Sequence, residues 1–263
     1  MRNAATIAVT FALLLALGGC SSTPPGSRPM RRPGSESDLA NPLYPFTLMR
    51  QGSVLLQQGR YDDALKSFEK AAQLQPENAT THNMVGLCYL KLEQYDKALA
   101  AFNKALDLVP SFSDARNNRG ATYLALKQYR LAEVDFLAVL GDPTYPHRWD
   151  VYYNLGMTYF DRGQLGAAVE NFRRAAYTTA PVFEAFLRLA EIAERQGKTD
   201  AAIDTLEQAH LKFPDQAEAT FRLGKLLFDA GRKDEARKYF KEIADSDPSS
   251  KLADEARKLL EAH

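Results

Sequence analysis

The side chains that most often perform catalysis are few in this sequence, and their spacing does not suit it. The four histidines, His82, His147, His210 and His263, include no pair with the three intervening residues of a helical zinc site. No glycine-rich phosphate loop is present, and no serine has the flanking glycines of a nucleophile elbow. Aspartates and glutamates recur at helical spacing, as on a solvent-exposed face. We therefore expect no enzymatic activity, cofactor, metal or small-molecule substrate.

Cys20 offers a different chemistry, because its thiol follows a segment typical of protein export. Residues 4–17 are uncharged and mostly apolar, and two glycines separate them from Cys20. This stretch is short for a membrane span, so we interpret residues 1–19 as a signal peptide. A cysteine directly after small residues resembles a bacterial lipobox, which implies that the Cys20 thiol carries a diacylglycerol and that the chain is palmitoylated. The alternative is an ordinary signal peptide followed by an incidental cysteine.

The lipobox resemblance also bears on where the protein resides. Ser21 follows the lipid site, and in sorted lipoproteins a residue other than Asp there favours the outer membrane, with the protein facing the periplasm. Residues 20–43 are rich in proline and serine and cannot build a core, which predicts an extended tether. Cys88 lies in a tyrosine- and leucine-rich helical pattern and is expected to be a small buried core residue, since a redox role would need a partner thiol.

The overall composition excludes several classes of protein. Hydrophobic residues make up 45% and charged residues 25% of the 263 residues, which is ordinary for a folded chain. Lys plus Arg equals Asp plus Glu at 33 each, and this net charge of zero argues against a nucleic-acid partner. Two cysteines are too few for a disulfide framework.

From residue 44 onward the chain repeats one motif with a period of 34 residues, interrupted once by 36. Small residues recur at two positions of each repeat, and a large apolar residue recurs four positions after the second of them. The first small residue is Gly52, Gly86, Gly120, Gly156, Ala190 or Gly224, and the second is Ala64, Ala98, Ala132, Ala168, Ala202 or Ala236. The large residue is Phe68, Phe102, Phe136, Phe172, Leu206 or Phe240. This pattern resembles the tetratricopeptide repeat.

The resemblance implies an all-α fold, a right-handed α-solenoid of six repeats, each formed by two antiparallel helices. The repeat domain would span 44–263, with glycines at the turns between paired helices, where a left-handed residue suits them. The repeats are 45–78, 79–112, 113–146, 149–182, 183–216 and 217–250, followed by a solubilising cap helix at 251–263. The longer period comes from an insertion at 141–148, which we interpret either as a tolerated loop or as a hinge between three repeats and three.

The resemblance further implies which face binds partners, because the first helix of each repeat lines a concave groove, mainly with positions 2, 5, 9, 12 and 13 of the repeat. We predict the partner-binding groove in the first three repeats, at Phe46, Met49, Leu56, Asn83, Leu87, Leu90, Asn117 and Leu124. The same face of the later repeats carries Tyr153, Met157, Phe160, Leu187, Phe221 and Phe228. An apolar groove suits an amphipathic helix or an extended apolar segment. Alternatively, about half of these side chains pack against neighbouring repeats, and those of the first repeat form a hydrophobic N-terminal cap.

The lipobox, the count of six repeats and one local run resemble the type IV pilus biogenesis lipoproteins of the PilF, PilW and Tgl kind. The run consists of Tyr145, Pro146 and Arg148, and leads to Asn154, Leu155 and Gly156. This resemblance implies a pilotin, which assists assembly of the outer-membrane secretin ring. The partner would be a secretin or another subunit of an envelope complex. The alternatives are an adaptor in cell-envelope or exopolysaccharide export, and a periplasmic carrier chaperone.

Overall fold

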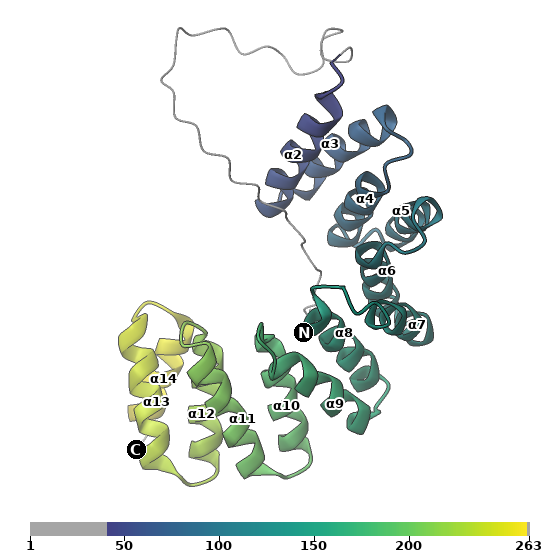
Figure 1. Ribbon diagram of the computed structural model, residues 1–263. Helices are drawn as coiled ribbons and strands as arrows, with labels where there is room; N and C mark the ends of the chain where they lie inside the picture. The colour runs from purple at the N-terminus through teal and green to yellow at the C-terminus, as the bar shows by residue number, and fades with distance from the viewer. Residues whose placement is uncertain (1–40, 262–263) are drawn as a thin grey trace, which may run out of the picture. The chain divides into compact units, whose positions relative to one another are not determined.

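The computed structural model describes residues 41–261, and these residues are entirely helical apart from turns and loops (Figure 1). The predicted signal peptide, Cys20 and nearly all of the predicted tether lie outside the described residues. The thirteen helices are α2 Tyr44–Gln57, α3 Tyr61–Leu74, α4 Ala79–Lys91, α5 Tyr95–Leu108, α6 Ser113–Ala125, α7 Tyr129–Leu140, α8 Arg148–Asp161, α9 Leu165–Ala176, α10 Phe183–Arg195, α11 Thr199–Lys212, α12 Ala217–Asp229, α13 Lys233–Ser246 and α14 Lys251–Glu261. The predicted all-α class is confirmed. No helix among them is long and apolar enough to cross a membrane.

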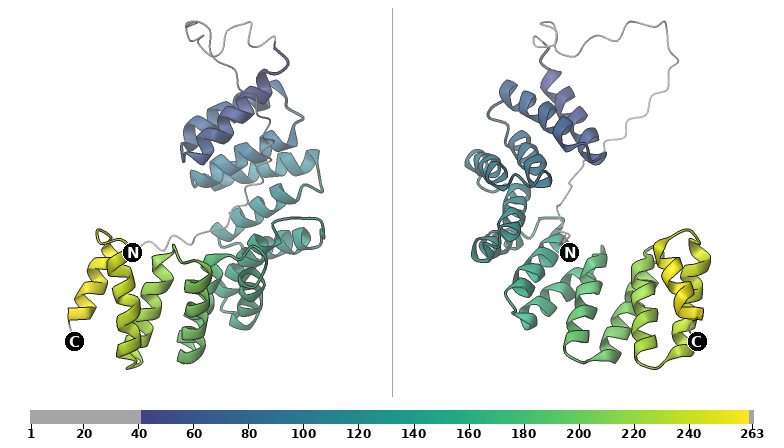
Figure 2. Two further views of the ribbon diagram at one scale, coloured as in Figure 1. Left: turned by 60° about the vertical axis from the view of Figure 1, so that its left-hand side comes forward. Right: turned by 180° about the vertical axis from the view of Figure 1, so that it is seen from behind.

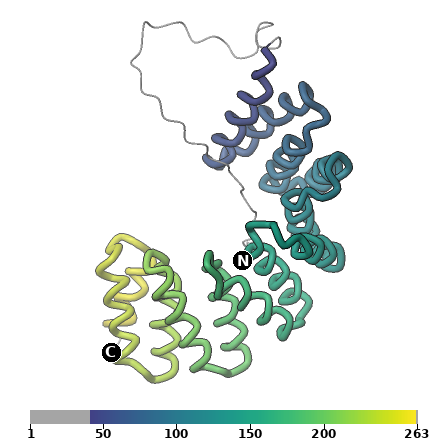
Figure 3. The backbone as a smooth tube through the Cα atoms, in the orientation of Figure 1, coloured from purple at the N-terminus to yellow at the C-terminus, as the bar shows by residue number. Residues whose placement is uncertain are grey.

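The helices fall into two compact units, which meet in the sequence between Tyr145 and Pro146. In residues 41–145, α2 packs on α3, α4 on α5 and α6 on α7, and each pair packs on the next (Figure 2). In residues 146–261, the pairs are α8 with α9, α10 with α11 and α12 with α13, and α14 covers the last pair. The backbone tube in Figure 3 shows the short turn that joins the two helices of each pair. Each unit therefore has the stacked helix pairs of an α-solenoid.

A glycine on the first helix of most repeats lies directly against the ring of a phenylalanine on the second. A Cβ atom added at Gly156 would lie 2.6 Å from Cδ1 of Phe172, and one added at Gly86 would lie 2.6 Å from Cε1 of Phe102. Both phenylalanines are fully buried, so the rings have little room to move. Glycine is therefore required at these positions by the close approach of the two helices.

The turns between paired helices also confirm an expectation from the sequence. The residue at the same position of all six turns has a left-handed backbone: Gly59, Glu93, Lys127, Gly163, Gly197 and Gly231, with φ of 73°, 58°, 58°, 73°, 69° and 81°. Glycine adopts this conformation without a steric penalty, whereas a residue with a Cβ atom is strained there. Two turns of residues 41–145 therefore contain a strained residue, and none of the three in residues 146–261 does.

Repeat three contains a buried ion pair whose arginine occupies a position that is apolar in four other repeats. The Arg119 guanidinium on α6 donates two hydrogen bonds to the Asp135 carboxylate on α7, both 2.8 Å long, and a third of 2.7 Å to Asn103 on α5. The side chains of Arg119 and Asp135 are 21% and 4% exposed, respectively. The residues equivalent to Arg119 in four other repeats are Val85, Leu155, Leu189 and Leu223. The pair joins three helices of residues 41–145 through charge-assisted hydrogen bonds.

The insertion before α8 is attached to the start of α6 by side-chain hydrogen bonds. Asp142 accepts from the Ser113 hydroxyl at 3.0 Å and from the Thr144 hydroxyl at 2.6 Å. The Tyr145 hydroxyl donates to Asp114 at 3.0 Å, and the Tyr145 side chain is buried. The first part of the insertion, which includes Pro143, thus closes repeat three.

Candidate functional site

The structure places six of the eight predicted groove residues in the interior of residues 41–145. Leu56, Asn83, Leu87, Leu90, Asn117 and Leu124 are between 0% and 7% exposed. Leu56 and Leu87 belong to one core cluster that joins the first two repeats, because side chains at these positions pack against the next helix pair. This is more than the half expected to pack between repeats, and these side chains present little surface in the folded unit.

The remaining two predicted residues lie on α2. Phe46 is 70% exposed, whereas Met49 is half-buried and its sulfur accepts a hydrogen bond from the Thr81 hydroxyl at 3.2 Å. Leu43 and Val54 are also exposed on or next to this helix. The accessible part of the predicted groove is therefore an apolar surface on α2. The other predicted residues do not extend it across the first three repeats.

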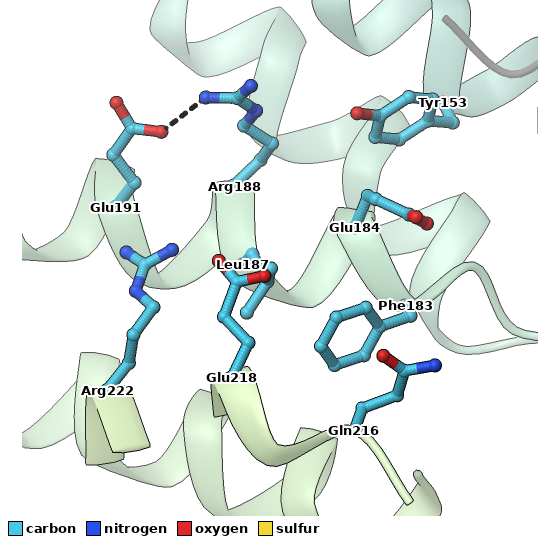
Figure 4. Close-up of a pocket in the computed structure, with 9 residues that line it drawn as sticks. All are labelled: Tyr153, Phe183, Glu184, Leu187, Arg188, Glu191, Gln216, Glu218 and Arg222. Carbon is cyan, nitrogen blue, oxygen red and sulfur yellow. Dashed lines mark hydrogen bonds and ion pairs between the residues drawn. The ribbon is translucent and has the colours of Figure 1, made fainter. Parts of the chain in front are cut away.

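A cavity of about 330 Å³ lies instead among the first helices of repeats four, five and six, within residues 146–261 (Figure 4). Its lining comes from α8, α10 and α12 and from the residue preceding α12: Tyr153, Phe183, Glu184, Leu187, Arg188, Glu191, Gln216, Glu218 and Arg222. Tyr153 and Leu187 belong to the predicted groove face of the later repeats. The charged residues were not predicted, because acids were expected to lie on solvent-exposed faces.

The repeat period explains how these charged side chains come together. Asp150, Glu184 and Glu218 occupy position 2 of successive repeats, each 34 residues after the last. Arg188 and Arg222 both occupy position 6. Since α8, α10 and α12 are equivalent helices, residues at one repeat position form a row along the same face. Reading positions 2 and 6 across repeats could have revealed both rows from the sequence.

At one end of the cavity, the arginines have acidic partners. The Arg188 guanidinium donates to Glu191 at 2.7 Å, and Glu191 also accepts from Arg195 at 2.5 Å. Arg222 on α12 reaches Glu194 on α10 at 3.3 Å. Figure 4 shows Glu191, Arg188 and Arg222 toward the left of the view and Glu218 near the middle, while Glu184, Phe183 and Gln216 lie toward the right. At this end both carboxylates are paired, and three guanidinium groups against two carboxylates leave a net charge of +1.

Two further carboxylates of the cavity, those of Glu184 and Glu218, add negative charge that no basic side chain among the described residues neutralises by direct contact. The carboxylates of Glu184 and Glu218 make no hydrogen bond or ion pair with any of the side chains described in residues 41–261. Burial raises the pKa of Asp150, the charge of Glu184 raises it further, and His147 acts in the opposite direction. Burial also raises the pKa of Tyr153, which is 1% exposed, although Arg188 favours its ionised form. The arrangement can accept hydrogen bonds from a cation but has no nucleophile paired with a base.

Within the described residues, no group of three or more His, Cys, Asp or Glu side chains is placed to hold a metal ion. Cys88 is fully buried, as expected, and burial raises the pKa of its thiol to about 12. The thiol is therefore protonated near neutral pH, which makes it a poor nucleophile.

Comparison with known structures supports the fold over most of the chain. A solved structure of PilW, described as a widely conserved type IV pilus biogenesis factor, is 22% identical, covers 84% of this chain and 99% of its own, and has a TM-score of 0.69. PilF of Pseudomonas aeruginosa is 20% identical, covers 81% and 96%, and has a TM-score of 0.66. YrrB, a tetratricopeptide-repeat protein described as having an unusual peptide-binding site, is 23% identical, covers 73% and 97%, and has a TM-score of 0.51. No curated protein sequence matches the chain.

Family models of the tetratricopeptide repeat match residues 49–111 and 187–251, and a second such model matches residues 150–179. The matched segments lie in both units and include helices that line the cavity. Together with the paired helices and the glycine–phenylalanine contacts, these matches show that the chain belongs to the tetratricopeptide-repeat family.

Proposed function

We propose that this protein is a lipid-anchored scaffold for protein–protein interaction, and specifically a pilotin that assists assembly of an outer-membrane secretin in type IV pilus biogenesis. The observation that carries the proposal is the end-to-end fold match to PilW and PilF, which includes 99% and 96% of their own chains. The interaction part of the proposal rests on the repeat fold, because stacked helix pairs form extended concave surfaces that are suited to polypeptide ligands.

The proposed anchor is the lipid on Cys20, followed by residues 20–43 as a tether to the repeats. A single acyl chain binds membranes only marginally, whereas two or more acyl chains hold a protein stably. The absence of Asp after Cys20 supports the outer membrane as the destination. The repeats would then face the periplasm, within reach of a secretin subunit.

For the partner-binding surface, we favour the cavity of residues 146–261, with Phe46 and Met49 as a second contact. The cavity combines apolar walls with charged groups, whereas the interior leucines of residues 41–145 are closed to a partner. Exposed apolar side chains such as Phe46 commonly mark contact surfaces.

Deletion of the gene tests the pilotin role through the amount of detergent-resistant secretin multimer on a gel. We expect secretin monomer to be made but multimer to be depleted, and the wild-type gene supplied in trans to restore it. Normal multimers in the deletion strain would contradict the pilotin role and favour an export adaptor or a carrier chaperone. In parallel, Cys20→Ser should move the protein from the membrane pellet to the soluble fraction, and its retention in the pellet would contradict the anchor.

A further inference from the structure

We infer that the cavity of residues 146–261 recognises a lysine or arginine side chain on an extended segment of its protein partner. This inference deepens the proposed function, since it rests on the partner being a polypeptide. It identifies Glu184 and Glu218 as the residues that select the basic side chain. Three observations carry it: unpaired carboxylates, an apolar wall beside them, and arginines that are already occupied by acids.

The first observation is that the carboxylates are not explained by contacts within the protein. Glu184 and Glu218 lie in the first turns of α10 and α12, where a negative charge interacts favourably with the helix dipole. That effect accounts for an acid in each first turn, including Asp150 on α8, but it supplies none of the side-chain donors that Glu184 and Glu218 lack. Glu184 raises the pKa of Asp150 beside it, so the like charges disfavour one another. A bound cation would relieve this repulsion.

The second observation is that the cavity can hold the hydrocarbon part of a basic side chain. Tyr153, Phe183 and Leu187 contribute apolar surface to its wall, and Tyr153 and Leu187 are held rigidly because they are buried. Lysine and arginine bury their methylene stems against apolar surface while the charged group remains among polar atoms. The stem would pack on these side chains, and the charged group would reach Glu184 and Glu218.

The third observation excludes the opposite ligand charge. Arg188 already donates to Glu191, and Arg222 is within 3.3 Å of Glu194. An acidic ligand would meet the carboxylates that already accompany these arginines, whereas a basic ligand finds acceptors without a partner. Each guanidinium has five N–H donors, so the arginines keep donors for the main-chain carbonyl groups of an extended segment. Both sets of groups thus fit one basic polypeptide.

The test selects ligands without assuming their sequence. Full-length protein purified in detergent is used to select from a library of random twelve-residue peptides displayed on phage. We expect Lys and Arg to be enriched over the starting library, and the enrichment to disappear with Glu184→Gln/Glu218→Gln. Enrichment of acidic peptides, of peptides without basic residues, or of none would overturn the inference, as would basic enrichment that the double variant leaves unchanged.

A selected peptide then measures the contribution of each carboxylate. Fluorescence anisotropy should show about a tenfold increase in Kd for Glu184→Gln or Glu218→Gln, because each removes a charge-assisted hydrogen bond. Asp200→Asn is the matched control, since Asp200 is an exposed acid in the first turn of α11 and does not line the cavity. An equal loss of affinity in the control would show a general charge effect and overturn the assignment.

Thermal melting of each variant establishes that the fold is intact. These measurements use no secretin, so they separate two possible failures. A pilotin that selects no basic peptide would refute only the ligand, and a protein that selects basic peptides without affecting secretin multimers would refute only the pilotin role.

Discussion

Equivalent positions on the first helices serve opposite purposes in repeats two and three and in repeats five and six. Position 9 holds Leu87 and Ala121 in repeats two and three, and both are buried within residues 41–145. Repeat four is similar to these, because Met157 at the same position is buried. In repeats five and six position 9 holds Glu191, which lines the cavity, and Lys225, which is exposed. The glycine, alanine and phenylalanine series is nearly the same in both units. One framework can therefore fill this face with side chains or leave it open to a ligand.

The units also differ in where they accept unfavourable local structure. Residues 41–145 contain the buried Arg119–Asp135 pair and two strained turn residues, Glu93 and Lys127. The equivalent turns of residues 146–261 all contain glycine, while the unpaired acids lie at the cavity. Carboxylates without a partner thus occur in the second unit where a ligand could reach them, which is the pattern expected of a binding site.

The largest effect that would test this contrast comes from charging the closed face. Leu56→Glu should lower the free energy of unfolding of residues 41–145 by at least about 4 kcal/mol, because it removes a buried leucine and buries a carboxylate. Phe46→Glu on the same helix is the control and should be nearly neutral, since Phe46 is 70% exposed. Denaturant unfolding followed by circular dichroism measures both. An unchanged midpoint for Leu56→Glu would mean that this face is open after all.

Removing one member of the buried ion pair should have the next largest effect. Arg119→Met leaves the Asp135 carboxylate without its main partner and should cost about 3 kcal/mol. Arg119→Met/Asp135→Ala should recover most of that loss, because apolar replacements of a buried pair are often neutral. A double variant as unstable as the single one would show that the three-helix connection itself, rather than the unpaired charge, determines the loss.

The contact between glycine and phenylalanine offers a test that should give the same result in both units. Gly156→Ala and Gly86→Ala each force a methyl group against a buried ring and should destabilise by about 1–2 kcal/mol, as overpacking outweighs the better helix propensity. Repeat five has a larger residue at the glycine position and a smaller one at the phenylalanine position, namely Ala190 and Leu206. The smaller leucine side chain would leave room for the methyl group of alanine. Gly156→Ala/Phe172→Leu should therefore be more stable than Gly156→Ala in thermal melting. A difference between the units would show that they do not share one helix spacing.

The smallest predicted effect is stabilising and confined to residues 41–145. Glu93→Gly and Lys127→Gly relieve a left-handed backbone strain, and each should raise the free energy of unfolding by up to about 1 kcal/mol. The reverse change, Gly197→Glu, should destabilise residues 146–261 by a similar amount. Chemical denaturation resolves such differences. If neither Glu93→Gly nor Lys127→Gly raised the free energy of unfolding, the left-handed backbone at these turns would not be strained.

The sequence predicted the helices, the turns and the buried Cys88, because each depends on spacing within one repeat. The left-handed glycines were expected from their place between the helices, whereas Glu93 and Lys127 at the same position do not signal a left-handed residue by type. The burial of Leu90 and Asn117 depends on how closely the next helix pair packs, which the spacing does not give. The row of Asp150, Glu184 and Glu218 was visible in the register, but acids in a first turn are usually exposed.

The exchange in repeat five has a consequence for how these repeats can change during evolution. Ala190 and Leu206 lie sixteen residues apart, as do Gly156 and Phe172 in repeat four. The exchange of one pair for the other therefore needs two separate substitutions. The order of the changes matters. Phenylalanine to leucine first leaves a small void, whereas glycine to alanine first forces a methyl group into the ring. Descent through the leucine intermediate is thus the easier route, and sequences with leucine opposite glycine should outnumber those with phenylalanine opposite alanine.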